Sequence, residues 1–186
     1  SDILSRYNAE TGKYFLYLGR LVQDKNPDFM IKAFRKAAVV GYKLIIAGSN
    51  DQQPDYVQYL QSLAEGDDNI VFTGAVYGAD KATLLRYCTA FCIPSTIEGL
   101  AITLFEAMSY GRLCIASDIP SNREGLGDNG IWVPAEDVDA LAEKISFVVS
   151  NYPSLTHIGE QNLQRVAQNF TWDIVAKRYV EYISTL

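Results

Sequence analysis

The chain has 186 residues, and its 16 lysines and arginines against 22 aspartates and glutamates give it a formal net charge of −6. This length suits one domain with its own core, and 48% hydrophobic against 20% charged residues excludes a disordered chain. An acidic sequence without a lysine and arginine cluster does not predict a duplex nucleic-acid binder, and no apolar run reaches the about 20 residues that span a bilayer.

Short apolar runs alternate with amphipathic stretches and predict alternating strands and helices. In chain order these are a strand at 14–18, a helix from 26, a strand at 44–47, a helix at 54–64, a strand at 70–73, a helix at 80–87, a strand at 90–93, a helix at 102–110, a strand at 113–116, a loop at 117–128, a strand at 131–133, and helices at 138–149, 154–169 and 172–185. Strands that are apolar almost throughout and separated by helices form a parallel sheet covered on both faces. We therefore predict a single α/β domain, a doubly wound and Rossmann-like parallel sheet.

Two cations follow the first predicted strand, at the carboxyl edge where such sheets bind ligands. Arg20 and Lys25 stand five residues apart behind Gly19, which lets a ligand approach the backbone. Asn26 and Pro27 predict the N-cap and first residue of the next helix. An arginine fork and a lysine charge beside free helix N–H groups suit a phosphate. Two solvated surface cations are the alternative.

A second loop, which follows the strand at 90–93, carries two carboxylates. Glu98 lies at the carboxyl edge of that strand, where a sugar hydroxyl could bind, and the amides of residues 99–102 form a helix N-terminus suited to an anion. Glu106 lies inside the helix among apolar neighbours, where a carboxylate is costly unless it is paired or bound. The alternative is a helix-start acid and an exposed helix residue.

Other chemistry has little support in the sequence. There is no GxGxxG, GxxxxGK[ST] or GxSxG motif, which disfavours a dinucleotide oxidoreductase, a P-loop ATPase and an α/β-hydrolase. Cys88, Cys92 and Cys114 have neither disulfide nor zinc spacing, so we expect reduced core thiols in a cytoplasmic protein. His157 is the single histidine and is expected at the surface. We expect no metal site and no cofactor.

Six segments, taken together and in order, resemble one family. They are GRLVQDK, LIIAGSND, IVFTGAV, PSTIEGLAITLFEAMSYG, ASDIPSNREGLGDNGIWVPAEDVDALAEKI and FTWDIVAKRYVEYI. From Tyr14 on, the chain resembles the C-terminal, nucleotide-sugar-binding domain of retaining GT-B glycosyltransferases of family four, the group 1 type. Glu98 and Glu106 match its Glu-x7-Glu motif.

The resemblance implies roles for the matching residues. Arg20 and Lys25 would hold the diphosphate of the donor and Glu98 would contact the transferred sugar, which makes these three the catalytic residues. Glu106 would accept hydrogen bonds from the ribose hydroxyls. The other positions expected to line the donor are Gly19, Val76, Gly99, Leu100 and Ala101.

The sequence departs from the family at two of these loops. Asn26 stands where a glycine often follows the lysine, and we expect little loss because asparagine is a good N-cap. Ala101 replaces the usual glycine or proline and slightly reshapes the sugar pocket. Asp118 and Glu124 match a loop near the donor, without a defined role.

The resemblance also implies a missing half. Members of the family carry an N-terminal Rossmann-like domain that binds the acceptor. We therefore expect a linker remnant at 1–13, the nucleotide-sugar-binding domain at 14–169 and a C-terminal crossover helix at 170–186. The expected partners are a nucleotide sugar and the missing domain. Any contact with a membrane would be made only through that missing domain.

The implied reaction moves a sugar from a UDP- or GDP-sugar to an acceptor hydroxyl, without a metal and with retention at the anomeric carbon. The product would be a polysaccharide, glycolipid or glycoconjugate, and the isolated chain would be inactive in transfer. One alternative is a GT-B nucleotide-sugar epimerase, which would need further catalytic acids and histidines. The other is a non-catalytic nucleotide-sugar-binding domain.

The last predicted helix has a continuous apolar stripe. It consists of Trp172, Val175, Ala176, Tyr179, Val180 and Ile183. An exposed stripe of this size is unusual for a monomer. We expect the helix to pack on its own domain or on a second copy, or else to be mobile.

Overall fold

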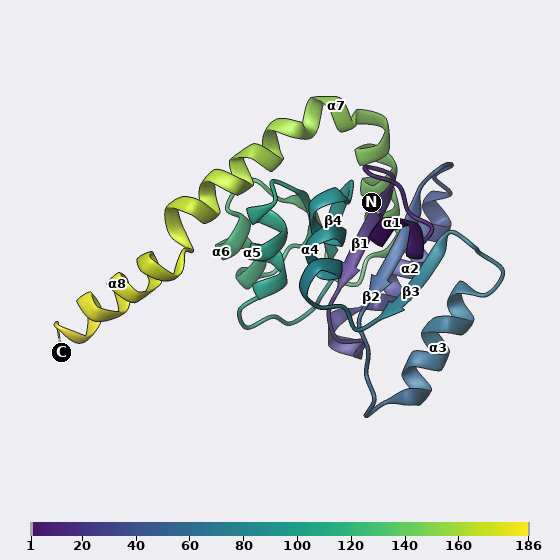
Figure 1. The fold of residues 1–186 in the computed structure, drawn as a ribbon, viewed down its shortest axis with the longest axis horizontal. Coiled ribbons are helices and arrows are strands. Elements are labelled where there is room, and N and C mark those ends of the chain that lie inside the picture. The colour runs from purple at the N-terminus through teal and green to yellow at the C-terminus, as the bar shows by residue number, and fades with distance from the viewer. Residues whose placement is uncertain (1, 186) are drawn as a thin grey trace.

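Six strands form the central layer of the computed structural model, which describes residues 2–185 (Figure 1). They are β1 (Tyr14–Leu18), β2 (Lys43–Ala47), β3 (Ile70–Gly74), β4 (Ala90–Ile93), β5 (Leu113–Ser117) and β6 (Ile131–Val133). All pair in parallel, in the order β3-β2-β1-β4-β5-β6. The chain builds the sheet from β1 toward β3 and then from β4 toward β6. This confirms the predicted doubly wound sheet and puts its switch point between β1 and β4.

Helices cover both faces of the sheet. One layer contains α2 (Pro27–Ala37), α3 (Pro54–Ala64) and the first part of α7 (Val138–Asn169), and the other contains α1 (Asp2–Arg6), α4 (Gly78–Tyr87), α5 (Ile102–Ser109) and α6 (Pro120–Leu126). On β1, Phe15 and Tyr17 pack in the first core and Tyr14 and Leu16 in the second. Because both faces of β1, β2, β4 and β5 are buried almost throughout, these strands have no alternating polar residues.

The long helix α7 corrects the prediction of two helices at 138–149 and 154–169. It runs unbroken through Pro153, and Figure 1 shows it bent. A proline inside a helix removes one backbone hydrogen bond and kinks the helix more often than it ends it when both sides pack well. Beyond the bend, α7 reaches the second layer, where Asn162 Nδ2 donates to the Arg112 carbonyl at 3.0 Å.

Two segments expected to lack regular structure contain short helices. The predicted loop at 117–128 holds α6, which begins at Pro120 after an extended Ile119. Residues 2–13, expected as a linker remnant, hold α1 and lie against α4. Leu4 is buried there, and Arg6 pairs with Asp80 at 2.6 Å. A proline at the first helical position was the available signal for α6.

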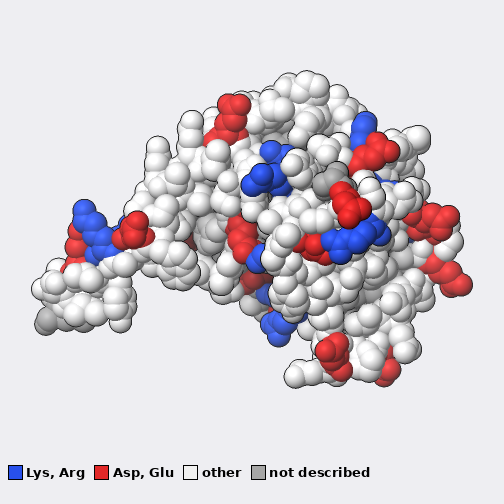
Figure 2. All heavy atoms as spheres, in the orientation of Figure 1, with Lys and Arg blue, Asp and Glu red and all other residues white. Residues whose placement is uncertain are grey.

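The last helix, α8 (Trp172–Ile183), extends away from the sheet (Figure 1), and Figure 2 shows it as a projection from the body of the molecule. None of its residues is buried, and Trp172 is 86% exposed. The predicted apolar stripe is therefore uncovered, and packing on its own domain is not what the structure shows. Among residues 2–185, no helix has both the length and the apolarity needed to cross a membrane.

Candidate functional site

The loops after β1 and β4 lie against each other at the switch point. The Thr96 amide donates to the Asp24 carbonyl at 3.0 Å, and Asn26 Nδ2 donates to the Pro94 carbonyl at 2.9 Å. These bonds join the two loops in which the sequence places candidate residues. The structure therefore brings Arg20, Lys25 and Glu98 together from separate parts of the chain.

Asn26 is the N-cap residue of α2 and Pro27 begins the helix, as predicted, but the Asn26 side chain does not cap the helix amides. Its backbone is left-handed, with φ 51°, and its side chain bonds Pro94 instead of the helix amides. Asparagine tolerates this conformation better than most side chains, and glycine tolerates it best. A positive φ thus accounts for the glycine that often occupies this position in the resembling family.

A cavity of about 170 Å³ lies between the two loops. Of the predicted residues, those that line it are Gly19, Arg20, Lys25, Glu98, Leu100 and Ala101. Gly99 lies in the same loop but is not among the lining residues. Ser95 and Thr103 also line the cavity; both lie in the segment PSTIEGLAITLFEAMSYG, but the resemblance assigned them no role.

Lys25 and Glu98 neutralise each other inside this cavity. Lys25 Nζ lies 3.1 Å from Glu98 Oε2 and donates to the Ile97 carbonyl at 2.7 Å. Ser95 Oγ donates to the other carboxylate oxygen, Glu98 Oε1, at 2.7 Å. The side chains of Lys25 and Glu98 are only 17% and 12% exposed, so the pair is largely shielded from water. Removing one partner would leave the other charge poorly solvated.

The guanidinium of Arg20, by contrast, is exposed and has no hydrogen bond or ion pair within the described residues. Its backbone is held, because the Tyr17 hydroxyl donates to the Arg20 carbonyl at 2.8 Å. Burial raises the pKa of Tyr17 far above its usual range, so this hydroxyl stays protonated and remains a donor. The guanidinium is therefore available to an anion at the mouth of the cavity.

A second cavity, of about 230 Å³, lies on the other side of Gly19 and Arg20. Val76, one of the expected donor-binding positions, lines it, and so does Lys81 from α4. Lys81 Nζ pairs with Glu106 Oε1 at 2.5 Å, which confirms that this helix carboxylate is paired. The other oxygen, Glu106 Oε2, is buried without a hydrogen-bond partner. Glu106 itself is not among the residues that line the cavity, which its partner Lys81 does line.

The remaining sequence candidates lie outside these cavities. Asp118 is exposed and held by Arg123, whose Nε and Nη2 donate to its carboxylate at 2.6 and 2.7 Å. This ion pair lowers the pKa of Asp118. The Glu124 carbonyl accepts from Arg165. Neither Asp118 nor Glu124 lines either cavity.

The cysteines and the histidine have structural positions. All three thiols are buried and unpaired, and burial raises the pKa of Cys88 to about 12. His157 is exposed, with Nδ1 2.9 Å from the Ser154 carbonyl oxygen. Within the part of the chain that the structure describes, no group of three or more His, Cys, Asp or Glu side chains is placed to hold a metal ion.

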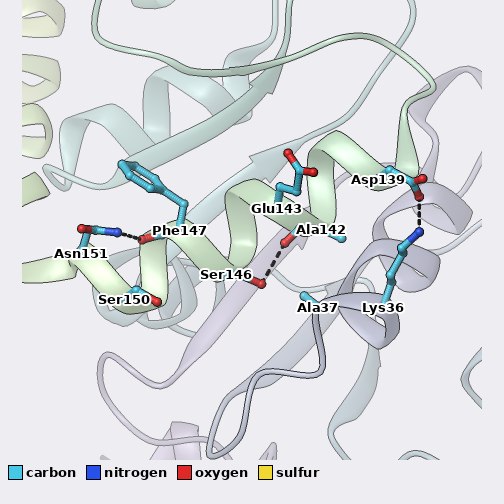
Figure 3. Close-up of a pocket in the computed structure, with 9 residues that line it drawn as sticks. All are labelled: Lys36, Ala37, Asp139, Ala142, Glu143, Ser146, Phe147, Ser150 and Asn151. Carbon is cyan, nitrogen blue, oxygen red and sulfur yellow. Dashed lines mark hydrogen bonds and ion pairs between the residues drawn. The ribbon is translucent and has the colours of Figure 1, made fainter.

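A larger hollow, of about 490 Å³, lies between α2 and α7 (Figure 3). All of its lining residues belong to these two helices, and Lys36 pairs across it with Asp139 at 2.6 Å. It includes none of the loops at the carboxyl ends of the strands. We therefore place the functional site at the switch point and not here.

Comparison with known proteins decides the family. The profile of the family described as glycosyl transferases group 1 matches residues 4–165. The chain belongs to this family. It is 30% identical over 171 residues to an uncharacterized glycosyltransferase, MJ1607, of Methanocaldococcus jannaschii, and 26% identical over 174 residues to O-antigen chain mannosyltransferase B of Escherichia coli. These matches cover 90% and 92% of this chain but 44% and 45% of the relatives, so the chain spans about half their length.

Solved structures show the same fold. Anabaena Alr3699/HepE, in complex with UDP and glucose, superposes with a TM-score of 0.90 at 20% identity. The match covers all of this chain and 52% of HepE. A glycosyltransferase from Rickettsia africae gives a TM-score of 0.89 over 97% of this chain and 50% of its own. The described domain is thus the Rossmann-like, C-terminal half of a GT-B fold.

Proposed function

We propose that this chain is the donor half of a retaining glycosyltransferase. It would bind a UDP- or GDP-linked sugar and take part in transferring that sugar to an acceptor hydroxyl, in the synthesis of a polysaccharide, glycolipid or glycoconjugate. The family supports transferase chemistry. HepE, which shares the fold, has been solved with UDP and with UDP-glucose.

One observation carries the proposal: the unpaired Arg20 guanidinium lies between two cavities of matching chemistry. A diphosphate at Arg20 would place the sugar beside Lys25 and Glu98 and the ribose beside Lys81 and Glu106. The first cavity is lined by a cation for phosphate charge and a carboxylate acceptor for hydroxyl groups, Lys25 and Glu98, and the second is lined by Lys81, which holds the carboxylate of Glu106. A nucleoside diphosphate sugar has these groups in this order.

The proposed chemical role is stabilisation of the leaving diphosphate. Charge develops on it as the sugar departs, and preorganised cations aimed at that position lower the barrier. Arg20 is free in this structure, whereas Lys25 would exchange Glu98 for a phosphate oxygen. Glu98 would then be free to accept from a sugar hydroxyl. We propose that these side chains and the amides at the start of α5 supply this stabilisation without a metal ion.

The acceptor belongs, in this proposal, to a second domain. The chain spans about half the length of the relatives cited above, and α8 presents an apolar stripe that none of residues 2–185 covers. We propose that the acceptor-binding domain packs against this stripe and that the isolated chain does not transfer sugar. Holding both reactants together is worth about 7–11 kcal/mol in favourable cases. The three unpaired thiols support a cytoplasmic location.

Calorimetric titration of UDP and GDP, with a chelator present, tests the proposal. We expect at least one of them to bind. Arg20→Ala should then weaken binding about ten- to hundredfold, since a hydrogen bond to a charged group is worth about 1.5–3 kcal/mol. Lys36→Ala removes a lysine paired on the distant α2–α7 surface and serves as the matched control. No heat at millimolar ligand, or equal losses in both variants, would contradict the proposal.

A further inference from the structure

We propose that Asn122 and Ser117 are positioning residues for Glu98, acting through Ser95. This inference rests on the proposed function, because it concerns the carboxylate assigned to the transferred sugar. Ser95, Ser117 and Asn122 belong to three different segments: the loop after β4, the end of β5 and the helix α6. No motif in the sequence connects them.

These three polar residues are buried at the carboxyl edge of the sheet. Ser117 and Asn122 are fully buried, and Ser95 is 2% exposed. Burying a polar side chain costs free energy unless it is hydrogen-bonded, so each of these three residues is expected to have a partner. Each of the three bonds toward the next, in the direction of Glu98.

The hydrogen bonds have a definite direction. Asn122 Nδ2 donates to the Ser117 carbonyl at 2.9 Å and to Ser117 Oγ at 3.2 Å. Because that hydroxyl oxygen accepts from the amide, its own proton is directed away, to the carbonyl of Ser95 or of Ile93. Ser95 Oγ in turn donates to Glu98 Oε1 at 2.7 Å. Asn122 thus fixes the backbone from which the Glu98 contact is made.

The loop after β4 is held from its other side as well. Asn26 binds the Pro94 carbonyl and Thr96 binds the Asp24 carbonyl. Residues 94–98 are therefore fixed between the loop after β1 and the end of β5. A side chain fixed from both sides is preorganised, and its ligand does not have to order it.

The hydrogen bonds that run from Asn122 through Ser117 and Ser95 to Glu98 are called the relay below. The relay becomes more important for the position of Glu98 when a donor binds. Within the described residues, the side-chain partners of the Glu98 carboxylate are Lys25 and Ser95. If Lys25 turns to a phosphate, Ser95 is the partner that remains. Loss of the relay should therefore weaken the contact with the sugar and leave the contacts of Arg20 with the diphosphate unchanged.

The test compares a nucleotide sugar with its nucleoside diphosphate, using UDP-glucose with UDP and GDP-mannose with GDP. We expect Asn122→Ala to weaken binding of the nucleotide sugar about two- to tenfold, the range for a neutral hydrogen bond, and to leave the diphosphate within about twofold. Ser95→Ala should do the same and Ser95→Thr, which keeps the hydroxyl, should not. If Asn122→Ala does not fold, Ser117→Ala removes the hydroxyl bond with a smaller change.

Asn162→Ala is the matched control. Asn162 is also fully buried and also donates to a backbone carbonyl, that of Arg112, but at the other end of β5. If Asn122→Ala and Asn162→Ala weaken both ligands of a pair by equal factors, Asn122 only supports the fold and the inference is wrong.

A second readout needs no ligand and separates this inference from the proposed function. The carbon-13 signal of the Glu98 carboxyl, assigned with Glu98→Gln, should shift in Asn122→Ala and stay in place in Asn162→Ala. If no nucleotide binds the unmodified protein, the proposed function fails while the signal still reports on the relay. An unmoved Glu98 signal in Asn122→Ala would overturn the relay whatever the ligands do.

Discussion

Replacing Glu106 by alanine should remove discrimination between ribose and dideoxyribose in the bound nucleotide. One carboxylate oxygen is held by Lys81, which lines the second cavity, at 2.5 Å, and the other, Oε2, is buried without a hydrogen-bond partner. In the proposed complex the ribose hydroxyls donate to Glu106. UDP should therefore bind more tightly than 2′,3′-dideoxy-UDP, or GDP more tightly than its dideoxy form, and Glu106→Ala should abolish the difference.

The effect of Glu106→Ala on ligand binding can be separated from its effect on stability, because the two carboxylate oxygens of Glu106 have different surroundings. The Lys81–Glu106 pair is about one-third exposed on both sides, so it contributes at most about 1 kcal/mol to folding. A hydroxyl that donates to a carboxylate contributes about 1.5–3 kcal/mol. Binding of the ribonucleotide should thus fall about ten- to hundredfold while the variant stays folded. Binding of the dideoxy nucleotide should hardly change.

Calorimetric titration of both ligands against both proteins closes a double-mutant cycle. The coupling free energy of this cycle should be close to the full binding energy lost in Glu106→Ala with the ribonucleotide, because the carboxylate and the hydroxyls are expected to act only on each other. Glu143→Ala, an exposed glutamate of α7, is the control and should keep the preference for ribose. A Glu106→Ala variant that still prefers ribose by the same factor would refute the assigned role.

Three further outcomes can be checked on the chain alone. Gly159→Ala should lower stability by about 1–3 kcal/mol in thermal unfolding, because its Cβ would overlap the Gly111 carbonyl; Gly99→Ala, which meets open space, should not, and equal melting would contradict this. The three buried thiols should resist a thiol reagent at pH 8, since burial raises the pKa of Cys88 to about 12 and raises the other two; reaction in the folded state would count against it. Truncation after residue 171, which keeps Phe170 packed on Phe105, should leave the melting temperature unchanged because no residue of α8 is buried, and a fall of several degrees would show that α8 packs on its own domain.

Most of the sheet could be predicted because each strand is apolar on both faces. The predicted bounds of β1, β4 and β6 agree with the structure, as do those of α3. Such runs need no long-range information, since any strand buried on both faces has this composition. The carboxyl edge, and with it the position of the site, follows from the strand and helix order alone.

The incorrect predictions fall where a local signal competes with tertiary contacts. Pro153 is a correct signal for a distortion, but α7 packs on both sides of it and continues. Asn26 stands at the N-cap of α2 as predicted, yet its backbone is left-handed and its side-chain amide binds the Pro94 carbonyl, so the expected side-chain cap is absent. In both cases the neighbouring segment, which is distant in sequence, decides what the residue does.

The same distinction applies to the site. Glu98 and Glu106 belong to one short motif, so the sequence could indicate both. Their charged partners, Lys25 and Lys81, lie on separate elements and meet the motif only after the sheet has formed. The spacing of the motif identifies the two carboxylates. The cations that orient them come from other elements, and the topology of the sheet decides which elements these are. The order of β1, β4 and β5 places the loops after these strands side by side, so that Ser117, at the end of β5, lies within hydrogen-bond reach of the loop that carries Glu98.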